Sequence, residues 1–137
     1  MASILKRGSY IRQVIVYLTD ILGVKAFTPE KTMQEVKEYL GELALKKKKP
    51  VDELLVAIRI LLLNVEIVSR NIYEVYLGKA EECVRDPCDI DFAALALSLT
   101  EKYDEVFLLT WNISDYRSDC LEKYKVSVFT PSNLKVL

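Results

Sequence analysis

The chain contains no histidine among its 137 residues. Histidine is the side chain whose ordinary pKa lies closest to neutral pH, and it is the most common metal ligand. Its absence excludes a Ser-His-Asp triad, a histidine general base and any metal site built on imidazole nitrogens. Acid–base chemistry or metal binding in this chain must therefore depend on carboxylates and other oxygen-bearing groups.

Cysteine is also scarce, since the chain has only Cys83, Cys88 and Cys120. They are odd in number and contain no Cys-x-x-Cys pair, so their spacing does not favour a structural zinc site. We expect three free thiols in a reducing cytoplasm, where disulfides are rare. A bridge between Cys83 and Cys88 is the alternative.

Long hydrophobic runs and an excess of charge of one sign are missing as well. The most apolar stretch, residues 54–68, is too short to span a bilayer and is interrupted by Arg59, Asn64 and Glu66. No signal-peptide pattern opens the chain. The net charge of −1 gives no general basic field for nucleic acid, although local basic patches remain compatible with it. The composition is that of one soluble globular domain with its own core.

The most informative stretch runs from Arg85 to Tyr116. An acidic loop leads into residues 92–99, which are apolar nearly all round, so this helix is predicted to be buried. The strand Val106–Leu109 follows, and it is apolar on both faces, as in a parallel sheet that is covered on both sides. Polar residues come just beyond the strand.

Three oxygen-bearing side chains are predicted to meet at one edge of this sheet: Asp89, Asn112 and Asp115. In open parallel sheets, sites form beyond the carboxyl ends of the strands, where the following helices begin. Asp89 lies at the amino end of the buried helix, where the helix dipole favours a carboxylate. Oxygen clusters of this kind suit Mg²⁺ or Mn²⁺.

Each of these acids also has a purely structural explanation. Asp89 belongs to the preferred helix N-caps, and Asp115 could begin the next helix with Ser114 as a competing cap. Asp86, which precedes Pro87, suits a turn. From the residues alone, capping is favoured over metal binding.

The rest of the chain alternates helices with strands, which predicts an α/β fold with a short parallel sheet. The further elements that we expect are helices at 8–22, 29–44, 50–64, 70–84 and 115–124, and strands at 24–27, 65–68 and 125–129. The helix 50–64 is apolar on several sides, so it is either covered by other elements or forms a dimer interface.

Two charged features remain ambiguous. Glu35 lies beside the apolar stripe of its helix, four residues after Lys31, and the residues alone favour a solvated ion pair between them. The run Lys46–Lys49 is typical of a solvated helix end, and contact with nucleic-acid phosphates is the alternative.

Several motifs, taken in order, resemble the PIN-domain family of metal-dependent nucleases, which includes the VapC-type toxins of toxin–antitoxin pairs. The motifs are Gly23–Val36, Asp89-Ile-Asp-Phe-Ala-Ala-Leu-Ala-Leu, Leu109-Thr-Trp-Asn112, Asp115-Tyr116 and Val128-Phe-Thr-Pro131. The resemblance extends from residue 8 to the carboxyl terminus, with Tyr116 where the family usually has Phe.

The resemblance implies a three-layer α/β/α sandwich that hydrolyses RNA with a water activated by Mg²⁺ or Mn²⁺. Asp89 would be the main metal ligand, Asp115 a second ligand, directly or through water, and Glu35 a third from the facing helix. Asn112 would orient the cluster or bind through its carbonyl. The resemblance further implies an RNA substrate and an antitoxin as protein partner. The cysteines favour a cytoplasmic protein, the apolar helix 50–64 favours a homodimer, and the short hydrophobic runs favour no membrane association.

One departure from the family concerns the amino terminus. PIN domains open with a strand that ends in a metal-binding Asp, and this chain begins with what looks like the segment after it. We therefore expect a single PIN-like domain over residues 1–137 that is amino-terminally incomplete. The alternative is a first strand at Val14–Asp20 with Asp20 as the ligand. Without the first Asp, activity would be greatly reduced or lost, so an inactive PIN-like module that binds RNA or a protein is the second functional hypothesis.

Overall fold

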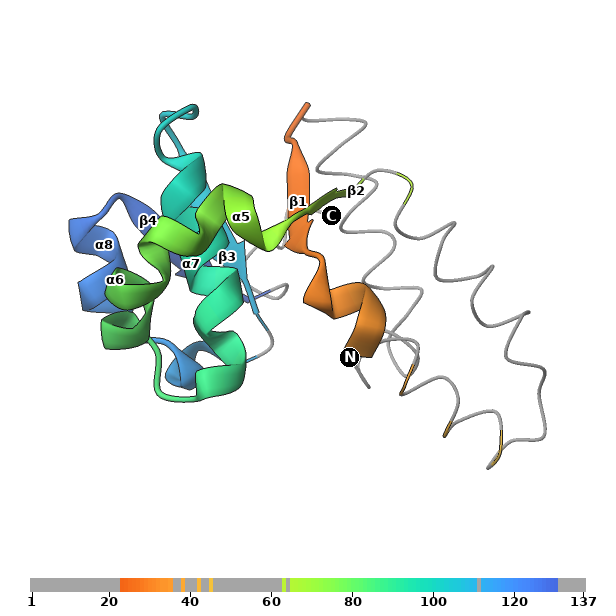
Figure 1. Ribbon diagram of the computed structural model, residues 1–137. Helices are drawn as coiled ribbons and strands as arrows, with labels where there is room; N and C mark the ends of the chain where they lie inside the picture. Colours follow the sequence, from red (N-terminus) through yellow and green to blue (C-terminus); the bar gives the residue numbers. More distant parts are fainter. Residues whose placement is uncertain are drawn as a thin grey trace. The chain divides into compact units, whose positions relative to one another are not determined.

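A computed structural model describes residues 23–35, 38, 42, 45, 63, 65–110 and 112–130 (Figure 1). The chain divides into two compact units, Met1–Ile67 and Val68–Leu137. The predicted helix 8–22, Asp20, the run Lys46–Lys49 and all of the predicted helix 50–64 except Leu63 lie outside the described residues. That the chain is a single domain stays a prediction.

A two-stranded sheet is made of β1 (Ala26–Pro29) and β2 (Val65–Val68), and the boundary between the two units falls within β2, before its last residue. β2 has its predicted bounds, whereas β1 begins and ends two residues later than the predicted strand 24–27. Pro29 therefore ends a strand instead of opening a helix, and the helix begins after a turn at Glu30. The Thr28 hydroxyl donates to the Thr32 hydroxyl at 3.0 Å and links the strand to the first helical turn.

The second unit begins with a helical segment that is interrupted in its middle. It consists of α5 (Arg70–Tyr73), the 3-10 turn η3 (Glu74–Tyr76) and α6 (Leu77–Cys83). The prediction of one continuous helix over 70–84 is therefore wrong. Tyr73 is fully buried and donates to Asp91 at 2.6 Å, and the Tyr76 hydroxyl donates to Glu101. These long-range bonds tie the segment to α7 and to the turn that follows α7, and a tighter 3-10 turn lies between their two tyrosines.

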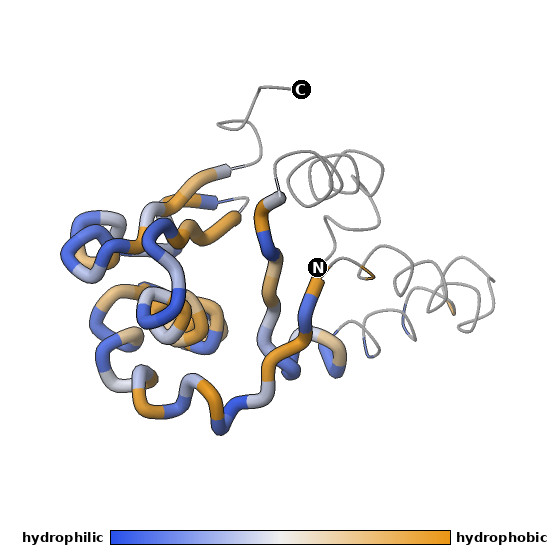
Figure 2. The backbone as a smooth tube through the Cα atoms, turned by 90° about the horizontal axis from the view of Figure 1, so that it is seen from above, coloured by the Kyte–Doolittle hydropathy of each residue, from blue (hydrophilic) through white to orange (hydrophobic). Residues whose placement is uncertain are grey.

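The helix α7 (Ile90–Leu99) is the most buried element of the second unit. Five consecutive residues, 93–97, are buried, and the helix contacts α5, η3, α6 and β3. Figure 2, in which hydrophobic residues are orange, shows α7 and β3 mostly orange. Because Ala93 and Ala94 have no exposed surface and small side chains, neighbouring elements can approach the helix closely. The prediction of a buried helix is confirmed.

A parallel strand pair completes the second unit. β3 (Val106–Leu109) pairs with β4 (Val126–Phe129), with Val106 opposite Val126 and Leu109 opposite Phe129. Parallel strands need a crossover connection, which α8 (Ser118–Lys123) supplies, and α8 packs on β4 while α7 packs on β3. The predicted α/β fold with a short parallel sheet is confirmed. Within the described ranges, no helix is long and apolar enough to cross a membrane.

Candidate functional site

The first acidic loop precedes α7. Pro87 opens the 3-10 turn η4 (Pro87–Asp89), and the Asp86 carboxylate caps it by accepting from the Cys88 backbone N–H at 3.0 Å. This is the turn role that the sequence allows for Asp86. Asp89 occupies the N-cap position of α7, but its side chain makes no capping hydrogen bond. The Asp89 carboxylate is therefore not used by the helix that it precedes.

The second acidic loop follows β3. The side-chain oxygen of Asn112 accepts from the Ser114 backbone N–H at 3.2 Å and from the Ser114 hydroxyl at 2.6 Å. The side-chain nitrogen of Asn112 donates to Asp115 Oδ1 at 3.2 Å. Asn112 thus caps the 3-10 turn η5 (Ile113–Asp115) and orients the Asp115 carboxylate. Of the two roles weighed for Asn112, this geometry favours orientation, because its carbonyl already accepts two hydrogen bonds.

Asp115 is not the cap of the following helix either. The N-cap position of α8 is Arg117, which makes no side-chain cap, so the helix begins later than the predicted residue 115. Neither acid of the predicted pair is therefore explained by capping of a regular α-helix. The Asp115 carboxylate instead accepts a hydrogen bond from the Asn112 side-chain amide.

A short antiparallel bridge joins the two acidic loops. Val84 pairs with Tyr116, and the Arg85 backbone N–H donates to the Asp115 carbonyl at 3.0 Å. The Arg85 guanidinium also donates to the Ser114 carbonyl. The loop that carries Asp86 and Asp89 therefore lies directly beside the loop that carries Asn112 and Asp115.

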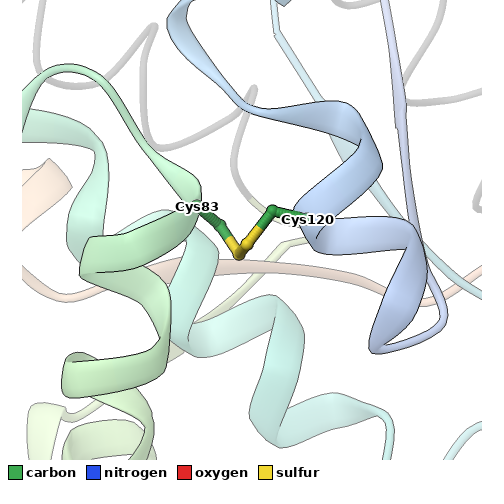
Figure 3. The surroundings of a disulfide bond; sticks show 2 residues. All are labelled: Cys83 and Cys120. Atoms are coloured by element: carbon green, nitrogen blue, oxygen red, sulfur yellow. A yellow bond between two sulfur atoms is a disulfide. The ribbon is translucent and has the colours of Figure 1, made fainter.

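A disulfide reinforces the same junction (Figure 3). Cys83, at the end of α6, is bonded to Cys120 in α8, and their Cα atoms lie 5.3 Å apart. The expectation of three free thiols is wrong, as is the alternative bridge to Cys88, which is exposed and lies outside the disulfide. The antiparallel bridge explains the pairing, because Cys83 directly precedes Val84 and Cys120 follows Tyr116 by about one helical turn.

Tyr116 lies where the two loops meet, and it is only 5% exposed. Burial raises its pKa far above the ordinary value, and the charges of Asp89, Asp115 and Asp86 raise it further, together with a hydrogen bond to Asp89. The hydroxyl of Tyr116 thus experiences the charges of three carboxylates from both loops.

Glu35 belongs to the first unit. It follows β1 on a helical turn and forms an ion pair with Lys31 at 3.9 Å, and its side chain is 47% exposed. The predicted pairing with Lys31 on a solvated surface is confirmed. Such exposed pairs contribute little stability, typically ~0–1 kcal/mol. A role for Glu35 as a metal ligand stays a prediction.

The second unit supplies carboxylates, Asp89 and Asp115 among them, as the oxygen donors that a divalent cation could use. Carboxylates are the ligands that Mg²⁺ prefers, and Mg²⁺ is commonly held by one or two of them while it keeps several waters. In the part of the chain that the structure describes, no three acidic or cysteine side chains lie close enough together to enclose a metal ion.

Two features of this site were not predicted from the sequence, the hydroxyl of Tyr116 and the disulfide. A signal for Tyr116 was available, because a tyrosine at a usually apolar position needs a polar partner when it is buried. No local signal could have identified the disulfide, since its cysteines are 37 residues apart.

Comparison with known protein families identifies the chain. The model of the PIN domain matches residues 2–102, which is well over half of the sequence. The chain therefore belongs to the PIN-domain family, and its short parallel strands and helices are consistent with the α/β fold predicted from the resemblance. Glu35 and Asp89 lie within the matched range, whereas Asn112 and Asp115 lie beyond it. Neither the curated proteins nor the solved structures contain a match to the chain.

Proposed function

We propose that this protein is a metal-dependent ribonuclease of the PIN type. Membership of the family supports a nuclease-like function and RNA as the bound nucleic acid. The observation that carries the proposal is the junction of the two acidic loops, where Val84 pairs with Tyr116 and the Arg85 backbone N–H donates to the Asp115 carbonyl at 3.0 Å. Asp89 and Asp115 are thereby carried on adjacent loops, and carboxylates are the ligands that Mg²⁺ prefers.

The chain's own residues have distinct parts in the proposed reaction. Asp89 and Asp115 would hold Mg²⁺ or Mn²⁺, and the Asn112 amide fixes the orientation of Asp115. When bound, such an ion lowers the pKa of the attacking water and balances charge on the leaving oxygen of the phosphodiester. Asp86 adds negative charge that strengthens cation binding. Glu35 is proposed as a further ligand on the family resemblance alone.

The proposed biological role is that of a toxin from a toxin–antitoxin pair, with an antitoxin protein as partner and a homodimer as the working form. Exposed apolar side chains support a protein partner, since Ile72 is 61% and Val75 is 80% exposed. A cytoplasmic location is proposed as well. Because disulfides are rare in a reducing cytoplasm, this location requires that the Cys83–Cys120 bond be protected, and Cys83 is fully buried.

Cleavage of a labelled single-stranded RNA pool tests the function. The intact protein should cut RNA with Mn²⁺ and stop when a chelator is added. Asp89→Asn should reduce cleavage by more than about 100-fold, because losing a ligand costs at least as much as losing an outer-shell partner. Asp104→Asn is the matched control, since Asp104 is an exposed carboxylate that precedes β3, whereas Asp115 follows it.

The outcomes separate the two functional hypotheses. Cleavage that is equal in the wild type and Asp89→Asn would contradict the assignment of the site. No cleavage by folded wild-type protein at any Mn²⁺ or Mg²⁺ concentration would overturn the nuclease proposal. The inactive PIN-like module that binds RNA or a protein would then be the better description.

A further inference from the structure

We propose that Arg85 binds a phosphate group of single-stranded RNA beside the candidate metal site, through guanidinium N–H groups that the fold does not use. This inference rests on the proposed function, because it names the side chain that would hold the substrate backbone at that site. Carboxylates repel phosphates, so a site that relies on acidic side chains for its metal benefits from a nearby cation for the RNA.

Arg85 is attached to the second acidic loop at two points. Its backbone N–H donates to the Asp115 carbonyl at 3.0 Å, and its guanidinium Nη1 donates to the Ser114 carbonyl. The first bond lies next to the Val84–Tyr116 pair of the antiparallel bridge, and both members of that pair are buried. The main chain of Arg85 is therefore fixed beside Asp115, while its side chain is exposed and reaches the residue before this acid.

The positive charge of Arg85 is not paired with an acid in the described part of the chain. Asp115, which lies opposite Arg85 at the bridge, accepts a hydrogen bond from the Asn112 amide instead. Among the described residues, the Arg85 side chain forms its one hydrogen bond with a carbonyl and forms no ion pair. Opposite charges at facing positions of paired strands ordinarily attract, so the two neutral partners keep this cation and this carboxylate apart.

The guanidinium of Arg85 retains donors for a phosphate. It carries several N–H groups in a planar fork, and the Ser114 carbonyl takes one of them. A pair of parallel N–H groups matches two oxygens of a phosphodiester, which is why arginine is favoured at phosphate sites. The bond to Ser114 also restricts the side chain, so less conformational freedom is lost when RNA binds.

The charge balance of the protein gives a single cation at this place particular weight. With a net charge of −1, no general basic field attracts RNA, and its phosphates must be bound by individual basic side chains. Arg85 belongs to the loop that carries Asp86 and Asp89, and it is bonded to the loop that carries Asp115. A phosphate on Arg85 would therefore lie at the junction of the two acidic loops.

Fluorescence anisotropy of a labelled single-stranded RNA, with chelator present to prevent cleavage, tests the proposal on the intact protein. Arg85→Gln removes the charge and keeps a polar side chain, and it should raise the Kd for RNA by about 5-fold at roughly 0.1 M salt. The dependence of log affinity on log salt should become shallower by about 0.7, the value for one phosphate contact on a single strand.

Arg117→Gln is the matched control. Arg117 is an exposed arginine on the other side of the Val84–Tyr116 pair, where its backbone N–H donates to the Cys83 carbonyl at 2.8 Å. This variant should keep the wild-type Kd and salt dependence. Equal losses in Arg85→Gln and Arg117→Gln would show that RNA responds to net charge alone, which overturns the inference.

Arg85→Lys separates a phosphate contact from a purely structural tie between the loops. Lysine keeps the charge and lacks the planar fork, so this variant should lose part of the affinity and keep the wild-type salt dependence. A structural tie through the Ser114 carbonyl would instead give Arg85→Lys the shallower salt dependence of Arg85→Gln, and this result overturns the inference.

The cleavage assay distinguishes failure of this inference from failure of the proposed function. Arg85→Gln should raise the KM for RNA and cut at nearly the wild-type rate at saturating RNA. A wild type that cuts RNA while Arg85→Gln binds it equally well overturns the inference and leaves the proposed function standing. A wild type that binds RNA through Arg85 and cuts none supports the phosphate contact and overturns the nuclease proposal.

A measurement on the unsubstituted protein covers the case in which the Arg85 variants do not fold. Nuclear magnetic resonance of protein with isotope-labelled arginine detects the side-chain Nε–H groups. Addition of the single-stranded RNA should shift the Arg85 signal and leave the Arg117 signal in place. An Arg85 signal that does not move in protein saturated with RNA overturns the inference.

Discussion

Opening the Cys83–Cys120 disulfide should remove a large part of the protein's stability. The two cysteines are 37 residues apart, so the bond closes a long loop in the unfolded chain. For a loop of this length, the lost constraint on the unfolded state corresponds to about 4 kcal/mol. Because small proteins are stable by only about 5–15 kcal/mol, the unfolding midpoint should fall by roughly 10–15 °C.

Thermal unfolding followed by circular dichroism, with and without reductant, measures this effect. Cys120→Ala should reproduce the lowered midpoint without reductant and should not respond to reductant further. Cys88→Ser should keep the full response, since Cys88 is exposed and outside the bond. An unfolding midpoint that does not change when reductant is added would refute the predicted stabilisation by the disulfide. Three reactive thiols in protein that was unfolded without reductant would refute it as well.

Two further predictions concern packing and pH. Ala94→Leu should lower the free energy of unfolding by about 1–3 kcal/mol in urea titrations. Ala94 has no exposed surface in α7, so a larger side chain must displace its neighbours. An unchanged urea midpoint would mean that the contacts of α7 are looser than the structure shows. The second prediction concerns pH: the free energy of unfolding should fall above pH 10. The pKa of Tyr116 is raised in the folded state, whereas the unfolded phenol loses its proton near pH 10. Tyr116 alone should therefore lower the free energy of unfolding by about 1.4 kcal/mol per pH unit. The stabilising contribution of Tyr116 is fully present below pH 10 and is lost as the pH rises toward the folded pKa. The free energy of unfolding of Tyr116→Phe should therefore decline less steeply with pH than that of the wild type. Parallel declines in the two proteins would contradict the prediction.

The elements that sequence predicted best are those whose residues specify them locally. β2 and β3 have their predicted bounds because short apolar runs between polar turns favour strands. The helix predicted over 70–84 is broken because the partners of Tyr73 and Tyr76 lie 18 and 25 residues away, beyond the reach of helical periodicity. β1 is displaced because Pro29 is compatible with both a strand end and a helix start, and local rules favoured the helix.

The site was predictable to the extent that it depends on chain order. Asp89 opens a helix and Asp115 follows a strand, so the α/β pattern alone placed their loops at one edge. The role of Asn112 is also local, because asparagine commonly bonds to the backbone two residues ahead, as it does with Ser114. The bridge between Val84 and Tyr116 joins segments that no local pattern connects, and the junction of the two acidic loops depends on it.

The two acidic loops share one arrangement, in which a single residue of each loop caps a 3-10 turn and a further acid does not cap a regular helix. In each loop one residue caps a 3-10 turn, Asp86 in the first and Asn112 in the second. The remaining acids do not cap a regular helix: Asp89 makes no side-chain cap on α7, and Asp115 accepts a hydrogen bond from the Asn112 amide at 3.2 Å.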